Sequence, residues 1–497
     1  MGAAPPPSLG ELRKSDPKMF NAIASSQLAV MNALNARIGQ VKLGGKVRFV
    51  DKDDDVFAFY SKADMGTILA HLTVLNIEGK DIPAFRWWLS KEDRKQYTHV
   101  VFEPNLRAAP AGALNLFRGF QVAPKAKPGG CAIFYDHLLR NACASDRAIY
   151  MFFLDWMASL FQRPGRKIGV APILYGDKGC GKSVIVDVLA ECIGPEYCPV
   201  VDTPEALTGK HNTHLARAVL IRVEEALHAK DPRHESRLKH MITGGRMLIE
   251  PKGVDAFEID SKCNLIFTTN KRHSVPASGS ERRFLCLQVA NNNQQDGPYF
   301  AAMLKQMREG GYAAFVADML SRDISRTDFS KPPVTALLST QIIESMTGLE
   351  KWWFATLASG RLPFVREPEA PDHDLEWPDA GCWTAPKALV QESANAYARD
   401  FAGPPTPEAV GKFLAAAVPG LTRSRRQVHG SREHTYIVPS LQDCRAAFVA
   451  DRPGLLLNHV SDAIPEAPTA APFTALPVSR EPGGRRVVAF PGARAGL

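Results

Sequence analysis

The sequence predicts an α/β P-loop NTPase core, preceded by an α+β region and followed by a small basic domain. The first observation is a glycine-rich loop, GDKGCGKS, that lies between an apolar strand and an apolar helix within residues 173–193. The second is a pair of later apolar segments, 218–226 and 264–270, that each end in acidic or polar residues. The third is a cluster of arginines near the C-terminus, in the stretch TRSRRQVHGSREH.

Length and composition support a soluble multidomain protein. The chain has 497 residues, 45% of them hydrophobic, which is enough for several domains with sizeable cores. The net charge of +8 fits a polyanionic partner but does not by itself identify one. Nine cysteines occur without a C-x-x-C pair, which indicates reduced thiols and a cytoplasmic protein. The most apolar stretch, 148–161, carries Asp155 and is too short to cross a membrane, so it predicts a buried helix.

Composition and periodicity divide the chain into seven segments. A hairpin is predicted over 41–60, with 41–50 as its first strand, and helices over 131–142 and 145–163. The segments are a loose N-terminus (1–17), an α+β accessory domain (18–130), the nucleotide-binding core (131–300), a helical extension (301–365), an acidic proline-rich linker (366–383), a basic domain (384–451) and a disordered tail (452–497).

The glycine-rich loop fits the pattern G-x-x-x-x-G-K-[ST] and predicts a site for ATP and Mg²⁺. In such a loop the backbone N–H groups surround phosphates at a helix N-terminus. Lys182 is expected to reach the β- and γ-phosphates, and the Ser183 hydroxyl to bind Mg²⁺. The same helix terminus is expected to make the Cys180 thiol reactive toward alkylation, with ATP protecting it. The predicted nucleotide contacts are Gly176, Asp177, Lys178, Gly179, Cys180, Gly181, Lys182 and Ser183.

Two later strands are expected to complete a hydrolytic site. AVLIRVEEA (218–226) ends in adjacent carboxylates, and we assign Glu224 to the metal and Glu225 to the general base that polarises water. NLIFTTN (264–270) ends in Asn270, whose amide can hydrogen-bond the γ-phosphate or the attacking water. The following residues resemble the guanine-reading N-K-x-D pattern, but His273 stands at its fourth position, so a GTPase is rejected.

Arg282 and Arg283 precede an alternating apolar strand. An arginine that reaches a neighbouring subunit's site can stabilise charge in the transition state of phosphoryl transfer. A surface pair or a structural ion pair would give the same two residues, and that alternative stays open.

A lysine-tipped hairpin is predicted between the acidic pair and the asparagine strand. Asp231-Pro232 is a typical helix start, and Gly244-Gly245 a typical end. Two strands then follow around a turn at 251–253, so that Lys252 lies at the tip of the hairpin.

Taken together, these motifs resemble the core of the superfamily 3 helicases, a branch of the AAA+ ATPases. The flanks 87–105, 323–338 and 436–448 resemble the helicase half of phage and plasmid primase-helicases, and the similarity spans about 30 to 450. The resemblance implies an AAA+-like motor in a hexameric ring, with Lys252 on DNA phosphates in the channel. It also implies Glu224 and Glu225 in hydrolysis, Asn270 as the sensor, and Arg282 as the finger with Arg283 beside it.

The chain departs from these relatives upstream of the motor, where many of them carry a primase-polymerase domain. The acidic run Asp51 to Asp55 is interpreted as a solvated turn, because no histidine or second acidic motif accompanies it. Any primase is therefore expected to be a separate protein.

The basic C-terminal domain is predicted to be winged-helix-like. Helices over 387–397 and 406–417 precede two strands around a turn near His429-Gly430. Its arginines suit sequence-independent phosphate contacts, although a protein-binding wing with solvated arginines is the alternative. They are Arg423, Arg425, Arg426 and Arg432.

The leading hypothesis is a replicative DNA helicase of a phage, prophage or plasmid that moves along DNA by ATP hydrolysis. A packaging or remodelling ATPase that does not unwind DNA is the second hypothesis. The third is a DNA-binding initiator or scaffold in which the nucleotide only triggers assembly.

Overall fold

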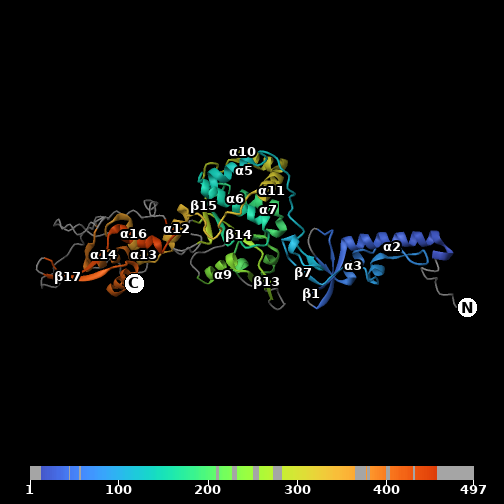
Figure 1. The fold of residues 1–497 in the computed structure, drawn as a ribbon, viewed down its shortest axis with the longest axis horizontal. Coiled ribbons are helices and arrows are strands. Elements are labelled where there is room, and N and C mark those ends of the chain that lie inside the picture. The colour runs from blue at the N-terminus through green and yellow to red at the C-terminus, as the bar shows by residue number, and fades with distance from the viewer. Residues whose placement is uncertain are drawn as a thin grey trace, which may run out of the picture. The chain divides into compact units, whose positions relative to one another are not determined.

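The computed structural model describes residues 13–43, 45–54, 58–208, 212–225, 232–249, 257–271, 282–363, 377, 381–398, 403–428 and 431–455. Its contacts divide the chain into two units, Met1–Gln341 and Ile342–Leu497 (Figure 1). Most of the predicted loose N-terminus, most of the predicted linker and nearly all of the predicted tail lie outside the described residues.

The first unit begins with a small α+β assembly around a four-stranded sheet of order β3-β2-β1-β6, in which only the β1–β6 pair is parallel. Its core is aromatic: Trp88 is fully buried, and Phe85 stacks on it with ring centroids 6.0 Å apart. The elements are α2 (Pro17–Arg37), β1 (Ile38–Leu43), β2 (Lys46–Asp51), β3 (Phe59–Tyr60), α3 (Lys62–Ile68), β4 (Thr73–Leu75), β5 (Asp81–Pro83), α4 (Ala84–Leu89), β6 (Gln96–Tyr97), β7 (His99–Val101), η1 (Leu106–Ala108) and β8 (Ala113–Asn115).

The predicted hairpin differs from the structure in one respect. Residues 41–50, expected as one strand, form parts of two strands that pair antiparallel, with Leu43 opposite Lys46. Gly45 in the turn has a φ of +74°, which glycine adopts without strain. Strand β2 then pairs with β3, so the hairpin around the acidic run is present as well.

The segment predicted to bind nucleotide forms a five-stranded parallel sheet of order β10-β11-β14-β9-β15. The chain leaves β9 for the far edge, returns strand by strand, and then passes β9 to form β15. Open parallel sheets bind ligands at the carboxyl ends of their strands where the strand order reverses, and the order reverses here at β9. The strands are β9 (Ala171–Tyr175), β10 (Val200–Val201), β11 (Leu220–Glu224), β14 (Asn264–Thr269) and β15 (Phe284–Gln288).

Helices pack on this sheet and provide most of the core. In Figure 1, α6, α7 and α11 lie above β14, and α9 lies below it. The predicted buried helix is α6, whose Trp156 is fully buried and donates to the Val170 carbonyl at 2.8 Å. The helical elements are α5 (Ala132–Asp136), a π-helical turn η2 (His137–Ala142), α6 (Arg147–Gln162), α7 (Lys182–Ile193), η3 (Pro195–Tyr197), α8 (Pro204–Thr208), η4 (Thr213–Arg217), α9 (Pro232–Thr243), α10 (Gly297–Gln306), η5 (Met307–Gly311), α11 (Tyr312–Ser321) and α12 (Ala336–Ser345).

The second unit combines four helices with a three-stranded antiparallel sheet of order β16-β18-β17. Both predicted helices and both predicted strands are present, whereas strand β16 was not predicted. The elements are α13 (Gly348–Ser359), β16 (Trp383–Pro386), α14 (Lys387–Ala398), α15 (Pro407–Ala417), β17 (Thr422–Val428), β18 (Ser431–Val438) and α16 (Leu441–Ala450).

Candidate active site

The glycine-rich loop lies at the carboxyl end of β9 and leads directly into α7, which begins at Lys182. Two of its glycines have left-handed backbones, Gly179 with a φ of +81° and Gly181 with a φ of +98°. A Cβ at Gly181 would lie 2.5 Å from His137 Nε2, so this position excludes a side chain on steric as well as backbone grounds.

The Lys182 side chain folds back over the loop instead of extending into solvent. Its Nζ donates to the carbonyls of Gly176 and Asp177, both at 2.7 Å, and to Asn270 Oδ1 at 2.8 Å. Lys182 is only 7% exposed, and its charge is balanced by these oxygens rather than by a carboxylate. A buried ammonium held by neutral acceptors is well placed to exchange them for an anion.

Glu225 and Asn270 are linked directly. The Asn270 N–H donates to Glu225 Oε1 at 2.9 Å, so Glu225, Asn270 and Lys182 form one chain of hydrogen bonds. Glu225 follows the end of β11 and has a φ of +53°, a conformation that costs free energy outside glycine. Three of the predicted site residues therefore come together at the carboxyl edges of neighbouring strands.

Glu224, the last residue of β11, has a different partner. Arg222 lies between two acidic side chains, with Nη2 2.5 Å from Asp187 Oδ1 and 3.5 Å from Glu224 Oε1. The longer contact leaves the Glu224 carboxylate, 40% exposed, available to another cation. The Ser183 side chain, in the first turn of α7, is exposed as well. A hydroxyl and a carboxylate are oxygen ligands of the kind that Mg²⁺ prefers.

An amide-rich segment after β15, Asn291 to Gln295, holds the outer side of the loop. Asn291 Nδ2 donates to Asp177 Oδ2 at 2.7 Å, and Gln294 Nε2 donates to the Lys178 carbonyl at 3.1 Å. The Gln295 N–H donates to the Gly179 carbonyl at 3.0 Å. The segment thus donates hydrogen bonds to two carbonyls and one carboxylate of the loop. Sequence reasoning missed it, although five consecutive amides after an apolar strand were a visible signal.

His137 packs against the loop at Gly181. It lies on the π-helical turn η2, is fully buried, and its Nδ1 accepts from Asn141 Nδ2 at 2.9 Å. Burial lowers the pKa of the His137 imidazole, although the Gly181 backbone and Asp136 act in the opposite direction. The sequence carried no signal for this role, because it depends on a contact between distant segments.

The expectation of a reactive Cys180 thiol is wrong. Cys180 is fully buried, and its Sγ lies 3.8 Å from Lys182 Nζ on the inside of the loop. A thiol in this position is shielded from alkylating reagents.

Arg282 and Arg283 lie at the amino end of β15, whereas the loop lies at the carboxyl end of the neighbouring strand β9. They precede β15, whereas the loop follows β9, and the two strands run parallel with Phe284 opposite Ala171. Five strand residues, about 15 Å, therefore separate the arginines from their own chain's loop. Arg282 is exposed and Arg283 is half-buried.

The predicted lysine hairpin is present as strands β12 (Arg246–Ile249) and β13 (Phe257–Asp260), which pair antiparallel. Lys252 and the rest of the tip lie outside the described residues.

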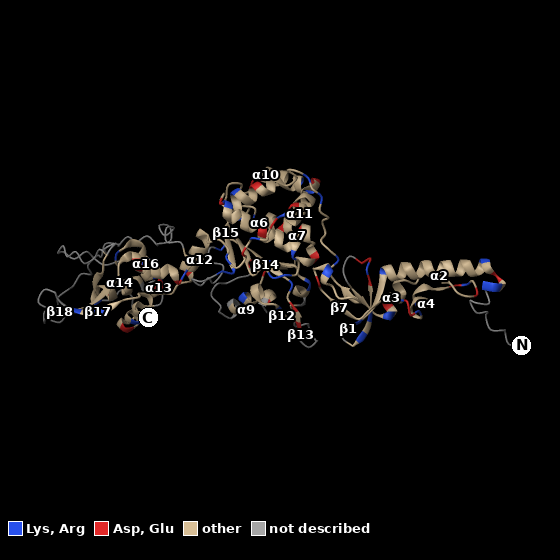
Figure 2. Cartoon of the chain, viewed as in Figure 1, with Lys and Arg blue, Asp and Glu red and all other residues tan. Residues whose placement is uncertain are grey.

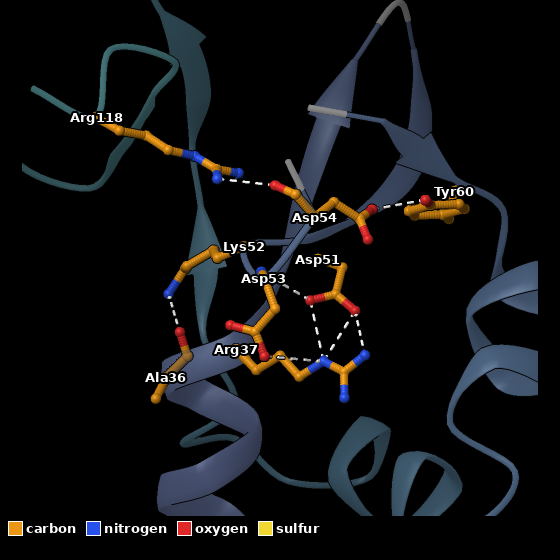
Figure 3. A network of polar contacts seen from close by, with 8 residues as sticks. All are labelled: Ala36, Arg37, Asp51, Lys52, Asp53, Asp54, Tyr60 and Arg118. Atoms are coloured by element: carbon orange, nitrogen blue, oxygen red, sulfur yellow. Dashed lines mark hydrogen bonds and ion pairs between the residues drawn. The ribbon is translucent and has the colours of Figure 1, made fainter. Parts of the chain in front are cut away.

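The acidic run is a structural network rather than a fully solvated turn (Figure 3). Asp51 is 1% exposed and forms a bidentate pair with Arg37, with Nη2 2.6 Å from Oδ2. Asp54 accepts from the Tyr60 hydroxyl at 2.6 Å, and its backbone carbonyl accepts from Arg118 at 2.8 Å. Of the three side chains in the ion pairs of Arg37 with Asp51 and Asp53, the Asp53 side chain is the largely exposed one. The carboxylates are committed to protein partners, and Asp55 lies outside the described residues.

The predicted basic residues of the C-terminal domain fall within the bounds of β17 and β18, the two strands labelled in Figure 2. Arg423 pairs in register with Tyr436, and Arg425 with His434, so these two arginines share one strand face. The side chains of Arg426 and Arg432 lie outside the described part of the chain.

Comparisons with known proteins agree on the fold and leave the activity open. A family model described as a family of unknown function, DUF5906, matches residues 174–283, which is less than half of the chain. No curated protein matches. The C-terminal region of NrS-1 (305–718) in its apo form is similar over 83% of this chain and 99% of that chain, with 17% identity and a TM-score of 0.57. An A-form apo structure of the same region gives 18% identity and a TM-score of 0.57 over 83% and 100% of the two chains.

These likenesses show a shared mixed α/β fold with a parallel sheet. No described helix is both long and apolar enough to span a membrane. The described residues also contain no cluster of three or more His, Cys, Asp or Glu side chains that would hold a metal ion by themselves.

Proposed function

We propose that the protein is an ATP-hydrolysing motor that acts on DNA, a helicase of phage, prophage or plasmid replication. The observation that carries the proposal is the hydrogen-bonded chain of Lys182, Asn270 and Glu225 at the carboxyl edges of β9, β14 and β11. A buried cation, an amide and a carboxylate next to a glycine loop are the groups that phosphate binding and water activation require.

The nucleotide site would use residues that are already in position. The loop from Gly176 to Ser183 supplies backbone N–H groups, and Lys182 exchanges its carbonyl partners for phosphate oxygens. Ser183 and Glu224 would hold Mg²⁺, which neutralises phosphate charge when bound. Asn270 touches Lys182 and Glu225 at once, so its contacts would change when Lys182 turns to the phosphates.

The position of the arginine pair supports hydrolysis in an assembly. Arg282 and Arg283 lie at the amino end of β15, away from their own chain's loop, so we propose that they serve the site of another subunit. A head-to-tail contact that repeats around an axis closes into a ring, which we propose to be a hexamer by resemblance. DNA would pass Lys252 on the β12–β13 hairpin, and the C-terminal arginines would add phosphate contacts through a winged-helix-like domain.

The decisive measurement is ATP turnover with and without single-stranded DNA for the wild type, Lys182→Ala and Lys252→Ala. DNA should stimulate the wild type, Lys182→Ala should be inactive, and Lys252→Ala should keep basal turnover but lose the stimulation. If DNA changes nothing in the wild type and Lys252→Ala behaves normally, the proposal fails, and a protein that assembles in response to nucleotide is the better interpretation.

A forked DNA substrate tests the finer part of the proposal. A helicase should release the displaced strand in an ATP-dependent reaction. DNA-stimulated turnover without strand release would instead identify a packaging or remodelling ATPase.

A further inference from the structure

The second unit contains a groove that the predicted functional residues do not explain. It has a volume of about 690 Å³ and lies between helices α14 and α15 and strands β17 and β18. Its lining includes three cationic side chains from three different elements, Lys387, Lys412 and Arg423, against one carboxylate, Glu408. The groove therefore concentrates positive charge that is far apart in the sequence.

Backbone dipoles add to this charge. Helix α14 begins at Lys387 and helix α15 at Pro407, and both starting residues line the groove. Two helix N-termini of this length place partial positive charge at the same opening. In the first turn of α15, Pro407 has no N–H, and the Ala409 and Val410 N–H groups donate to Thr406, which leaves the Glu408 N–H for a ligand.

Tyr436 lies at the floor of the groove. It is 5% exposed, and no hydrogen bond joins its hydroxyl to any described residue, although it approaches the Cα of Gly411 so closely that a Cβ there would lie 3.2 Å away. Lys387 Nζ lies over the Tyr436 ring, 5.0 Å from its centroid. Tyr436 thus adds a hydroxyl, which can donate a hydrogen bond, to the lining of the groove.

We propose that this groove binds the phosphodiester backbone of a nucleic acid strand. The lining includes two ammonium groups, a guanidinium and a phenol, which can all donate hydrogen bonds, and a phosphodiester presents acceptors only. A strand leaving the groove would continue past Arg425, which shares the strand face of Arg423. This inference rests on the proposed function for its DNA, but it assigns binding to Lys387, Lys412 and Tyr436, which the arginine pattern did not indicate.

A phosphodiester strand is favoured over an acidic peptide by the lining of the groove. Two ammonium groups, a guanidinium and a phenol line the same groove, which suits a compact tetrahedral anion repeated along a chain. Binding of this kind is blind to sequence and strongly dependent on salt.

The test measures binding of the full chain, without nucleotide, to a fluorescent single-stranded oligonucleotide at several salt concentrations. Lys387→Ala and Lys412→Ala should each weaken binding equally for unrelated sequences and reduce the slope of log K against log salt by about 1. Tyr436→Phe, which keeps the ring, should weaken binding about tenfold. Arg361→Ala removes one exposed positive charge of the same unit outside the groove and should leave binding unchanged.

Polyglutamate serves as a competitor of a different chemistry. It should displace the oligonucleotide poorly, and equally poorly from the wild type and Lys412→Ala. Wild-type affinity in all three groove variants would overturn the proposal, and so would polyglutamate that competes as well as DNA.

The basal ATP turnover of the groove variants separates this inference from the proposed function. Turnover without DNA should match that of the wild type in Lys387→Ala, Lys412→Ala and Tyr436→Phe. If the groove variants lose DNA affinity while the turnover of the wild type does not respond to DNA, the groove is a nucleic-acid site and the proposed motor function is wrong.

Discussion

At the scale of single residues, the site depends on where charges and amides lie relative to the ends of parallel strands. Glu225 illustrates this dependence, because its φ of +53° brings the carboxylate to the Asn270 N–H at 2.9 Å. With an extended backbone at Glu225, the side chain would point to the other face of the sheet, away from the Asn270 N–H. The structure accepts local strain here, and strained backbones of this kind concentrate at functional sites.

Glu225→Gln tests the assignment of the general base. Glutamine keeps the size of the side chain and can still accept the Asn270 N–H, but it cannot take a proton from water. We expect turnover to fall by about 10²- to 10⁴-fold, with ATP binding nearly unchanged. Steady-state turnover and equilibrium ATP binding would be measured together, with Glu78→Gln as an exposed control carboxylate. Full turnover in Glu225→Gln would remove this residue from hydrolysis.

Gly181→Ala tests the fit between the loop and His137. The added Cβ would lie 2.5 Å from His137 Nε2 and 2.8 Å from Phe300 Cε1, at a φ of +98°. We expect nucleotide binding to be lost while the protein stays folded, because the strain falls on the loop. Gly245→Ala is the matched control, since nothing lies within 4 Å of its Cβ position. Normal ATP binding by Gly181→Ala would show that the loop moves away from His137 at little cost.

At the scale of elements, the amide-rich segment 291–295 couples strand β15 and helix α10 to the loop. It binds Asp177 and the carbonyls of Lys178 and Gly179. Because the segment holds the acceptors of the loop, the loop N–H groups can point toward a phosphate. The segment is therefore a positioning element rather than a catalytic one.

Replacing Asn291 and Gln294 together by alanine removes two side-chain contacts to the loop. Each net hydrogen bond contributes about 1 kcal/mol, so we expect ATP affinity to fall by roughly tenfold or slightly more. Binding of DNA without nucleotide should not change. The readout is ATP affinity by titration, with Asn105→Ala as an exposed asparagine elsewhere. Unchanged ATP affinity would mean that the loop holds its shape alone.

The sequence predicted the elements whose residues are neighbours in the chain. The loop, helix α7, the acidic end of β11 and the asparagine end of β14 each combine apolar periodicity with a local break, and the structure contains all of them. The order of the strands, the contact of His137 with the loop and the Arg222–Asp187 ion pair depend on contacts between distant segments. Periodicity reports which residues are buried, but not against which element they pack.

Strand β16 and the β1–β2 turn show the same limit at shorter range. The segment from Trp383 to Pro386 is only four residues long, and its pairing with β18 is what makes it a strand. Residues 41–50 alternate like one strand, and only the left-handed Gly45 reveals that they fold back. A glycine pair is compatible with either structure, so the sequence could not decide between them.

Helix α13 carries a pH-dependent cap. Glu350 reaches back to the Thr347 N–H at 2.8 Å and accepts from Arg452 at 2.8 Å. Burial raises the pKa of Glu350, but these hydrogen bonds outweigh it and place the pKa below the ordinary value of 4.5. A lowered pKa stabilises the ionised folded state above 4.5, and this stabilisation is lost as the pH falls through the folded pKa.

Glu350→Gln should therefore lower the thermal stability of the protein at neutral pH. The difference from the wild type should shrink as the pH falls below 4.5, because the wild-type carboxylate then takes up a proton. Thermal unfolding as a function of pH measures both effects. A stability difference that is independent of pH would show that the cap acts through shape and not through charge.

At the scale of the whole molecule, the proposed site is divided between the two ends of the parallel strands. The carboxyl ends carry the loop, Asn270 and Glu225, and the amino end of β15 carries Arg282 and Arg283. Under the proposal, the first set binds nucleotide within one chain, and the second set serves the site of a neighbouring subunit. Nucleotide binding and rapid hydrolysis should therefore respond differently to dilution, because only hydrolysis needs a neighbouring subunit.

Mixing two inactive variants tests this arrangement directly. Lys182→Ala subunits keep Arg282 but cannot hold nucleotide, and Arg282→Ala subunits hold nucleotide but offer no arginine to a neighbour. In rings formed from equal amounts of both, about a quarter of the contacts would join an intact loop to an intact arginine, so the mixture should recover measurable turnover. Arg283→Ala mixed in the same way shows which arginine serves the neighbour, because only the true partner of the site gives recovery. A mixture as inactive as its components, in rings that sizing shows to contain both, would place the arginines outside hydrolysis.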